Sequence, residues 1–354
     1  MHNLQLTEDQ DMIVDTVRKF VADVVAPKVL EHDEHRTFVR DQFEGLAELG
    51  VFGLSIREAS GGVGMGLLPF VAALESVGLH SSSLASLWIG QVQCAAALEA
   101  TGSDALADIL TGAQLVAFIG PEHRIVMNAG SVTGSVTGSA RVVPAGGEAQ
   151  LFVVAAQENG IPVLALVRAD ACKRVPLRAL GLASAACAAI TFDGAVATTV
   201  ASGEAAAAAI QKAQVVAWIG VAAAAVGGAI GSIAASKKHA SERIAFGKPL
   251  LVQEAVQRKL VESRRLVDAA RQLTWHAARV ADLGQNAIEA AITARLAAID
   301  AVVLAADEAI QIHGGFGYTV EYHVERHYRD GKTFEVLDGG GELLRNRLAT
   351  IQLA

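Results

Sequence analysis

The chain has 354 residues, of which 52% are hydrophobic and 19% are charged, and its formal net charge is −8. A chain of this length and composition can bury a large core, which excludes a disordered or fibrous protein. The acidic balance argues against a nucleic-acid-binding surface.

The first part of the chain, from Leu6 to about Thr111, has a helical pattern. Thr7 and Gln10 have the spacing of a capping box, and apolar residues follow at helical intervals. The stretch "FEGLAELGVFGLSI" predicts a short helix closed by Gly50. At the very start, "MHNLQLTEDQ" lacks a basic segment followed by an apolar run, so no secretory signal is expected.

Two groups of residues could suggest metal or redox chemistry. The segment "EHDEH", Glu31 to His35, has residue types found in metal sites, but it follows Pro27 and we interpret it as a solvated polar connection. The cysteines are far apart and have no CxxC spacing, which predicts buried thiols in a reducing cytoplasm; they are Cys94, Cys172 and Cys187. Neither a metal site nor a disulfide is expected.

The middle of the chain, from about Ala113 to Gly203, has short runs rich in Val, Ile and Thr between Gly, Pro and Asp. This pattern predicts a compact β domain. No glycine pattern typical of a Rossmann fold or a P-loop is present.

Helical patterns return after Glu204, with long helices predicted over Gln253–Leu283 and Ala287–Ile312. The uncharged stretch Ala213–Ser236 is long enough to span a membrane, but it consists mainly of Ala and Gly. We therefore expect a helix packed closely among other helices and no membrane span. The predicted fold is mainly α with an inserted β domain, and the predicted domains are residues 1–112, 113–203 and 204–354.

Several stretches resemble the acyl-CoA dehydrogenase family. The segments "ASERIAFGKPLLVQEAVQRKL" and "QIHGGFGYTVEYHVERHYRDGKTFEVLDGGGELLRNRLA" are similar to its C-terminal domain, and "LTEDQDMIVDTVRKFVADVVAPK" is similar to its N-terminal domain. The resemblance implies an N-terminal helical domain, a central β domain and a C-terminal four-helix bundle. It also implies an FAD enzyme, usually a dimer of dimers, with electron-transfer flavoprotein as the electron acceptor.

In that family a carboxylate removes the α-proton of an acyl-CoA thioester while the β-hydrogen leaves as hydride to flavin N5. Read without gaps from Gln311, the family's catalytic Glu falls on Asp338, and its following turn falls on three glycines, Gly339 to Gly341. The alternative interpretation is that Asp338 is only a helix N-cap.

The resemblance also assigns residues that contact FAD, in part from a neighbouring subunit. The group that follows the long uncharged helix consists of Arg243, Phe246 and Gln253. The group at the end of the later helix consists of Gln311, Gly314 and Gly315. The group just after Asp338 consists of Gly340 and Glu342. A guanidinium suits phosphate oxygens, and paired glycines allow the backbone to approach a ligand closely.

The chain departs from the family at three places. Asp is one methylene shorter than Glu, and the alternative position for the base aligns near Ala217, which has no carboxylate. The Thr-Glu pair before Pro121 is replaced by Ile119-Gly120, and "VTGSARVVPAG" has neither the aromatic residue nor the Lys of the family's flavin-facing strand. The residues expected to contact a neighbouring subunit's FAD are therefore present, while few of the residues expected to bind the chain's own isoalloxazine remain.

Three functions fit this pattern. The chain is a self-sufficient acyl-CoA dehydrogenase of lipid or steroid side-chain degradation, or a non-catalytic or half-site partner subunit of a heteromeric, actinobacterial-type enzyme. The third possible function is that of a flavin oxidase or monooxygenase with the same fold.

Overall fold

The computed structural model describes residues 4–128 and 133–353 of the chain. Helices come first, then strands, then helices again, as the sequence predicts. The helices before the strands are α1 (Glu8–Phe20), α2 (Val29–His35), α3 (Arg40–Glu48), α4 (Leu67–His80), α5 (Ser82–Leu98) and α6 (Ala105–Leu110).

Local signals set the ends of several of these elements. Thr7 and Gln10 form the predicted capping box at the start of α1, and Gly50 closes the α3 segment with a φ of 70°. The segment Glu31–His35 is part of helix α2, so its interpretation as a loop was wrong. Asp33 on that helix forms an ion pair of 2.6 Å with Arg329, which ties α2 to the C-terminal bundle. Within the described residues, no group of three side chains is arranged to hold a metal ion.

The strands form one strongly curved sheet. Strand β4 pairs with β1, β2 and β5, while β7 pairs with β3, β5 and β6; since β2 also pairs with β3, the sheet closes on itself. The strands are β1 (Val116–Ile119), β2 (Ile125–Asn128), β3 (Thr133–Val143), β4 (Leu151–Glu158), β5 (Ile161–Arg168), β6 (Lys173–Pro176) and β7 (Ala188–Ser202).

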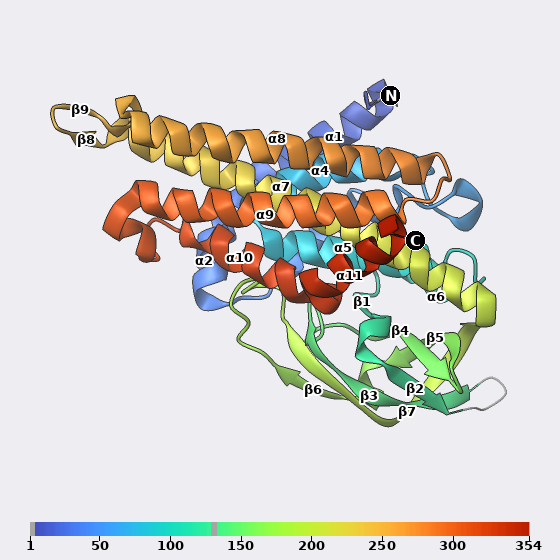
Figure 1. The fold of residues 1–354 in the computed structure, drawn as a ribbon. Coiled ribbons are helices and arrows are strands. Elements are labelled where there is room, and N and C mark those ends of the chain that lie inside the picture. The colour runs from blue at the N-terminus through green and yellow to red at the C-terminus, as the bar shows by residue number, and fades with distance from the viewer. Residues whose placement is uncertain (1–3, 129–132, 354) are drawn as a thin grey trace.

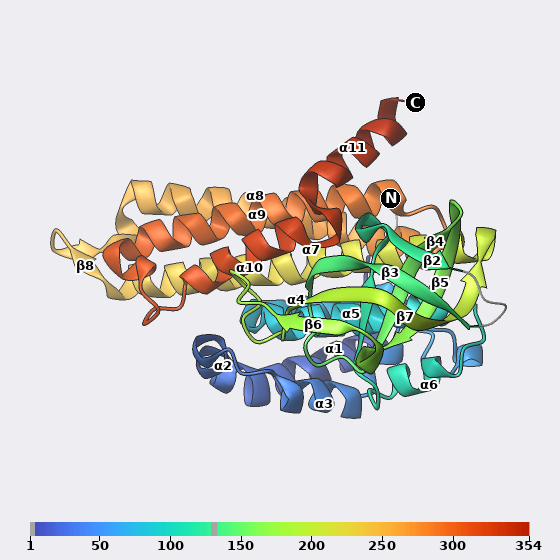
Figure 2. The same ribbon diagram turned by 90° about the horizontal axis from the view of Figure 1, so that it is seen from below.

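Of the remaining helices, all but the last pack side by side as a long bundle, and the last projects away from it (Figures 1 and 2). They are α7 (Gly203–Glu242), α8 (Glu254–Asp282), α9 (Ile288–His313), α10 (Glu325–Val336) and α11 (Gly340–Leu353), with a hairpin of β8 (Ile244–Ala245) and β9 (Lys248–Pro249) between α7 and α8. The strand layer lies against one half of this bundle, and the hairpin projects from the opposite end (Figures 1 and 2). The division into three domains with the expected boundaries stays a prediction.

Helix α7 is the central element of the bundle. It is long and apolar enough to cross a membrane, but 89% of its most apolar stretch is buried inside the chain, as in a core helix. Its small residues permit close contact with α4: a Cβ on Gly227 would collide with the carbonyl oxygen of Glu75, and one on Gly78 with that of Ala224. The sequence-based expectation of close helix packing is confirmed.

Buried polar groups fix α8 against α4. The Asp282 carboxylate accepts hydrogen bonds from the backbone N–H groups of Leu67, at 2.6 Å, and Leu68, at 3.2 Å, which caps the start of α4. Glu75, in the middle of α4, accepts from Arg271 at 2.8 Å and from the indole N–H of Trp275 at 2.6 Å. These contacts hold α4 and α8 together.

Candidate active site

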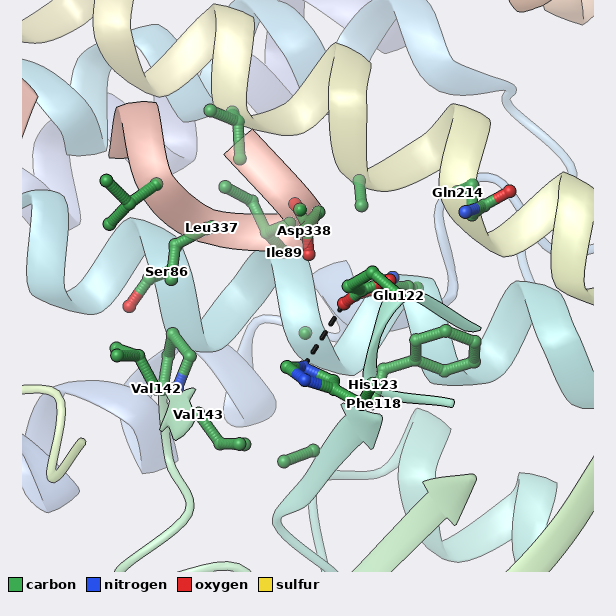
Figure 3. A pocket seen from close by; sticks show the side chains of 18 of the residues that line it. Ser86, Ile89, Phe118, Glu122, His123, Val142, Val143, Gln214, Leu337 and Asp338 are labelled. Carbon is green, nitrogen blue, oxygen red and sulfur yellow. Dashed lines mark ion pairs between the residues drawn. The ribbon is translucent and has the colours of Figure 1, made fainter. Parts of the chain in front are cut away.

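A cavity of about 910 Å³ lies where the bundle meets the strand layer. Helices α5 and α7 form one side, the ends of β1 and β3 form another, and the α10–α11 turn closes it (Figure 3). Its lining is mainly apolar, with polar groups that include Ser86, Gln93, Glu122, His123, Gln214 and Asp338. A mainly apolar cavity with a few convergent polar groups is typical of a small-molecule site.

The α10–α11 turn places Asp338 in this cavity. Asp338, Gly339 and Gly340 have φ values of 52°, 88° and 79°, so three consecutive residues lie in the left-handed region. Glycine adopts this conformation freely and Asp tolerates it better than most residues, which explains why a helix-rich chain has glycines here. The predicted tight turn at this position is therefore present.

The Asp338 carboxylate is held by a buried arginine that the sequence analysis missed. Arg295, 1% exposed on α9, donates from Nη1 to Asp338 Oδ2 at 2.8 Å. Its Nη2 donates to the carbonyl oxygens of Phe334, at 3.1 Å, and Leu337, at 2.6 Å, at the end of α10. This cation therefore neutralises both Asp338 and the carbonyl-rich end of a helix. A lone Arg among the alanines of "EAAITARLAAI" was the available clue.

A second carboxylate, Glu122, faces Asp338 from the turn between β1 and β2 (Figure 3). Its side chain is 12% exposed, and His123 Nε2 lies 3.2 Å from its Oε1. Burial, together with the charge of Asp338, raises the pKa of Glu122 to about 7. Burial also lowers the pKa of His123, so this imidazole is neutral at pH 7 and supplies no counter-charge.

Glycine at position 120 makes room for the Glu122 side chain. A Cβ built on Gly120 would collide with both carboxylate oxygens of Glu122. The backbone of Gly120 has φ −74° and ψ 166°, which any residue can adopt, so the glycine is required here for space and not for conformation. The acidic residue two places after this glycine was visible in the sequence, but no role was given to it.

The raised pKa of Glu122 predicts a pH-dependent stability. Between pH 4.5, the ordinary pKa of Glu, and about pH 7, Glu122 is protonated in the folded chain and ionised in the unfolded chain. The free energy of unfolding therefore falls as the pH rises through this window. The charges facing Glu122 are Asp338 and Arg295, with His123 neutral. We expect Glu122→Gln to match wild type at pH 4 and to be more stable at pH 8 by on the order of 2 kcal/mol. Urea unfolding at both pH values measures this, and equal differences at both would contradict it.

The other predicted cofactor residues lie mostly at the far end of the bundle. Arg243 and Phe246 belong to the β8–β9 hairpin segment, Gln253 precedes α8, and Gln311 lies in the last turn of α9 next to Gly314 and Gly315. These two groups of residues lie side by side, since His239 at the end of α7 stacks on His313 at the end of α9 with ring centroids 4.2 Å apart. We call this end the distal strip. Gly340 adjoins Asp338, while the Glu342 side chain is 86% exposed and pairs with Arg345 on the surface.

The distal strip is far from the cavity of the same chain. Ala217 on α7 lines the cavity, and Arg243 follows the end of that helix. At about 1.5 Å per residue, the two positions are about 40 Å apart along α7. One bound dinucleotide cannot reach both, so the residues of the two groups cannot serve a single cofactor within one chain.

Comparisons with known proteins match the helical parts on both sides of the strands. Residues 7–110 match the family described as acyl-CoA dehydrogenase, N-terminal domain, and residues 207–353 match acyl-CoA dehydrogenase, C-terminal domain. The chain belongs to the acyl-CoA dehydrogenase family. Members of this family and its structural neighbours are FAD-binding flavoproteins, in line with the cofactor implied by the resemblance.

Some relatives match nearly the whole chain at modest identity, and others match a shorter part at higher identity. The acryloyl-CoA reductase (NADH) of Anaerotignum propionicum is 27% identical, covering 96% of this chain and 93% of the relative. The human mitochondrial short-chain specific acyl-CoA dehydrogenase is 39% identical over 127 residues, which is 36% of this chain and 31% of the relative. The butyryl-CoA dehydrogenase structure of Megasphaera elsdenii superposes with a TM-score of 0.92 at 24% identity, covering 100% of both chains, and confirms the fold.

One departure from the acyl-CoA dehydrogenase pattern, the segment "VTGSARVVPAG", lies on the strand wall of the cavity. Val142, Val143 and Pro144 of this wall carry no side-chain donor, and Pro144 has no amide N–H. Ala217, the alternative position for a base, also lines the cavity and offers only a methyl group. The carboxylates within reach of a ligand in this part of the cavity are thus Asp338 and Glu122.

Proposed function

We propose that the chain is a subunit of an FAD-dependent acyl-CoA dehydrogenase that introduces an α,β double bond into an acyl-CoA thioester. The observation that carries this proposal is the convergence of Asp338 and Glu122 in a mainly apolar cavity. An α-proton next to a thioester is only weakly acidic, and a carboxylate in a dry cavity is the kind of base that can remove it. The sequence assigns this role to Asp338.

The distal strip fits the ADP half of FAD. Arg243 is exposed on the surface, and a Cβ at Gly314 or Gly315 would meet no atom within 4 Å, so the backbone there is open to a ligand. Since this strip is remote from the chain's own cavity, we propose that it completes the FAD site of a neighbouring subunit. An oligomer with shared sites, such as a dimer of dimers, follows from this arrangement.

The chain's own residues prepare the substrate. Apolar residues of α5 and α7 surround the acyl group and exclude water, which strengthens the electrostatic effects inside the cavity. Arg124 and Arg141 line the cavity with exposed side chains and offer cations to the phosphates of CoA. FAD, when bound, supplies the acceptor for the β-hydride, and a cavity carboxylate holds the α-proton.

The visible absorption spectrum of the chain purified by itself tests this function. We expect a flavin spectrum with about one FAD per chain, bleached anaerobically by butyryl-CoA or a longer acyl-CoA. A protein with bound flavin that no acyl-CoA of any length bleaches would contradict acyl-CoA dehydrogenation.

The strand wall favours a second candidate, in which the chain is the half-site partner of a related subunit. Val142, Val143 and Pro144 offer no side-chain donor, so an isoalloxazine beside these three residues would have fewer hydrogen bonds than the family pattern implies, although Ser139 and Arg141 also line this wall. This candidate predicts a colourless chain that becomes a flavoprotein only when co-expressed with a relative. Arg243→Ala in the co-expressed pair should then lower the FAD content, whereas in a self-sufficient monomer it should not.

The remaining details stay predictions. They are a role in lipid or steroid side-chain degradation, a cytoplasmic location, electron-transfer flavoprotein as the acceptor and the number of subunits.

A further inference from the structure

The two carboxylates of the cavity have unequal surroundings. Asp338 already accepts a hydrogen bond from Arg295, whose other nitrogen is fixed by the carbonyls of Phe334 and Leu337. A carboxylate bound to a guanidinium is stabilised as the anion and is a weaker proton acceptor than one without such a partner. Asp338 is therefore held in one position by a buried guanidinium, and one of its oxygens is occupied by that contact.

Glu122 has the opposite surroundings. It lies in the cavity wall, its side chain is mostly buried, and its ion-pair contact within the described residues is to His123, which burial keeps neutral. Asp338 faces it across the cavity, and the charge of a neighbouring carboxylate makes a carboxylate more basic. Gly120 leaves the space in which this side chain is seated.

We propose that Glu122 is the catalytic residue that takes the α-proton of the thioester, and that Asp338, held by Arg295, is its electrostatic partner. The proposal rests on the proposed function and identifies the base within it. A Glu122 oxygen forms an O–H bond as the Cα–H bond breaks, and that electron pair forms the Cα–Cβ double bond. FAD, when bound, would be the oxidant and would supply the acceptor for the β-hydride.

Proton removal can be measured without hydride transfer. In 3-thiabutyryl-CoA the β position is sulfur, so the α-proton can leave but no β-hydride is available. The chain, incubated with this thioester in D₂O, should exchange the α-protons for deuterium, which mass spectrometry follows. Binding of the thioester, measured by calorimetry for each variant, shows that the cavity is intact.

We expect Glu122→Gln to lower the exchange rate at least about 100-fold with little change in thioester affinity. Gly120→Ala should lower it about 10-fold or more, because the added methyl group displaces the Glu122 carboxylate. Asp338→Asn should retain exchange but move the midpoint of its pH profile to lower pH, since the negative charge that makes Glu122 more basic is gone. Glu48→Gln, on the exposed face of α3, is the matched control and should behave as wild type.

Two results would overturn the assignment. If Asp338→Asn abolishes exchange while Glu122→Gln retains it, Asp338 is the base and the dehydrogenase function stands. If wild type catalyses no exchange at any pH, Glu122 is not a working base; should acyl-CoA also fail to bleach bound flavin, the proposed function is wrong as well.

Discussion

Arg295→Met is expected to lower the free energy of unfolding by about 3–5 kcal/mol, as is usual when one partner of a buried ion pair is removed. Arg295 is 1% exposed and makes hydrogen bonds to Asp338 and to two carbonyl oxygens at the end of α10. Methionine fills a similar volume but donates no hydrogen bond, so it leaves these three acceptors unpaired. Chemical denaturation at pH 7 measures the loss.

A double-mutant cycle separates the ion pair from the carbonyl contacts. Asp338→Asn removes the charge of the partner, and the double variant Arg295→Met with Asp338→Asn should be less destabilised than the sum of the two single changes. The coupling free energy between the two substitutions measures the contribution of the ion pair. A loss below about 1 kcal/mol for Arg295→Met would show that water or rearranged side chains replace its contacts.

Features encoded by local sequence could be predicted, and those produced by tertiary contact could not. The capping residues Thr7 and Gln10 and the stop at Gly314 depend on a few neighbouring residues, and the structure has them as expected. The position of Asp338 in a cavity also followed from the resemblance. By contrast, the polar composition of Glu31–His35 and its position after Pro27 predict a loop, whereas the segment is helical and α2 directs Asp33 toward Arg329.

The incomplete prediction of the site has the same cause. Arg295 precedes Asp338 by 43 positions, and only the packing of α9 against α10 brings them together. Glu122 belongs to a turn between two short strands, so no periodic pattern indicates which way its side chain points. A single charged residue in a helix of small apolar residues, such as Arg295, is the sequence feature most worth testing in related chains. If such a residue is buried, it requires a partner.

The close contact between α4 and α7 predicts the second large change in stability. Two neighbouring glycines on α7 test it, because an added Cβ would collide with the α4 backbone at one of them and not at the other. A Cβ at Gly227 would collide with the Glu75 carbonyl oxygen and lie 2.8 Å from the Leu79 amide nitrogen, both backbone atoms of α4. At Gly228, one residue later on α7, the nearest atom to an added Cβ is a Val302 methyl at 3.5 Å, an ordinary contact. Both positions gain helix propensity from alanine, up to about 1 kcal/mol.

We therefore expect opposite results from the same substitution. Gly227→Ala should destabilise the chain by about 3 kcal/mol, because backbone atoms of a packed helix cannot move aside as a side chain can. Gly228→Ala should be neutral or slightly stabilising. Thermal unfolding of both variants against wild type makes the comparison. If Gly227→Ala unfolds at the same temperature as Gly228→Ala, the two helices are farther apart than the structure has them.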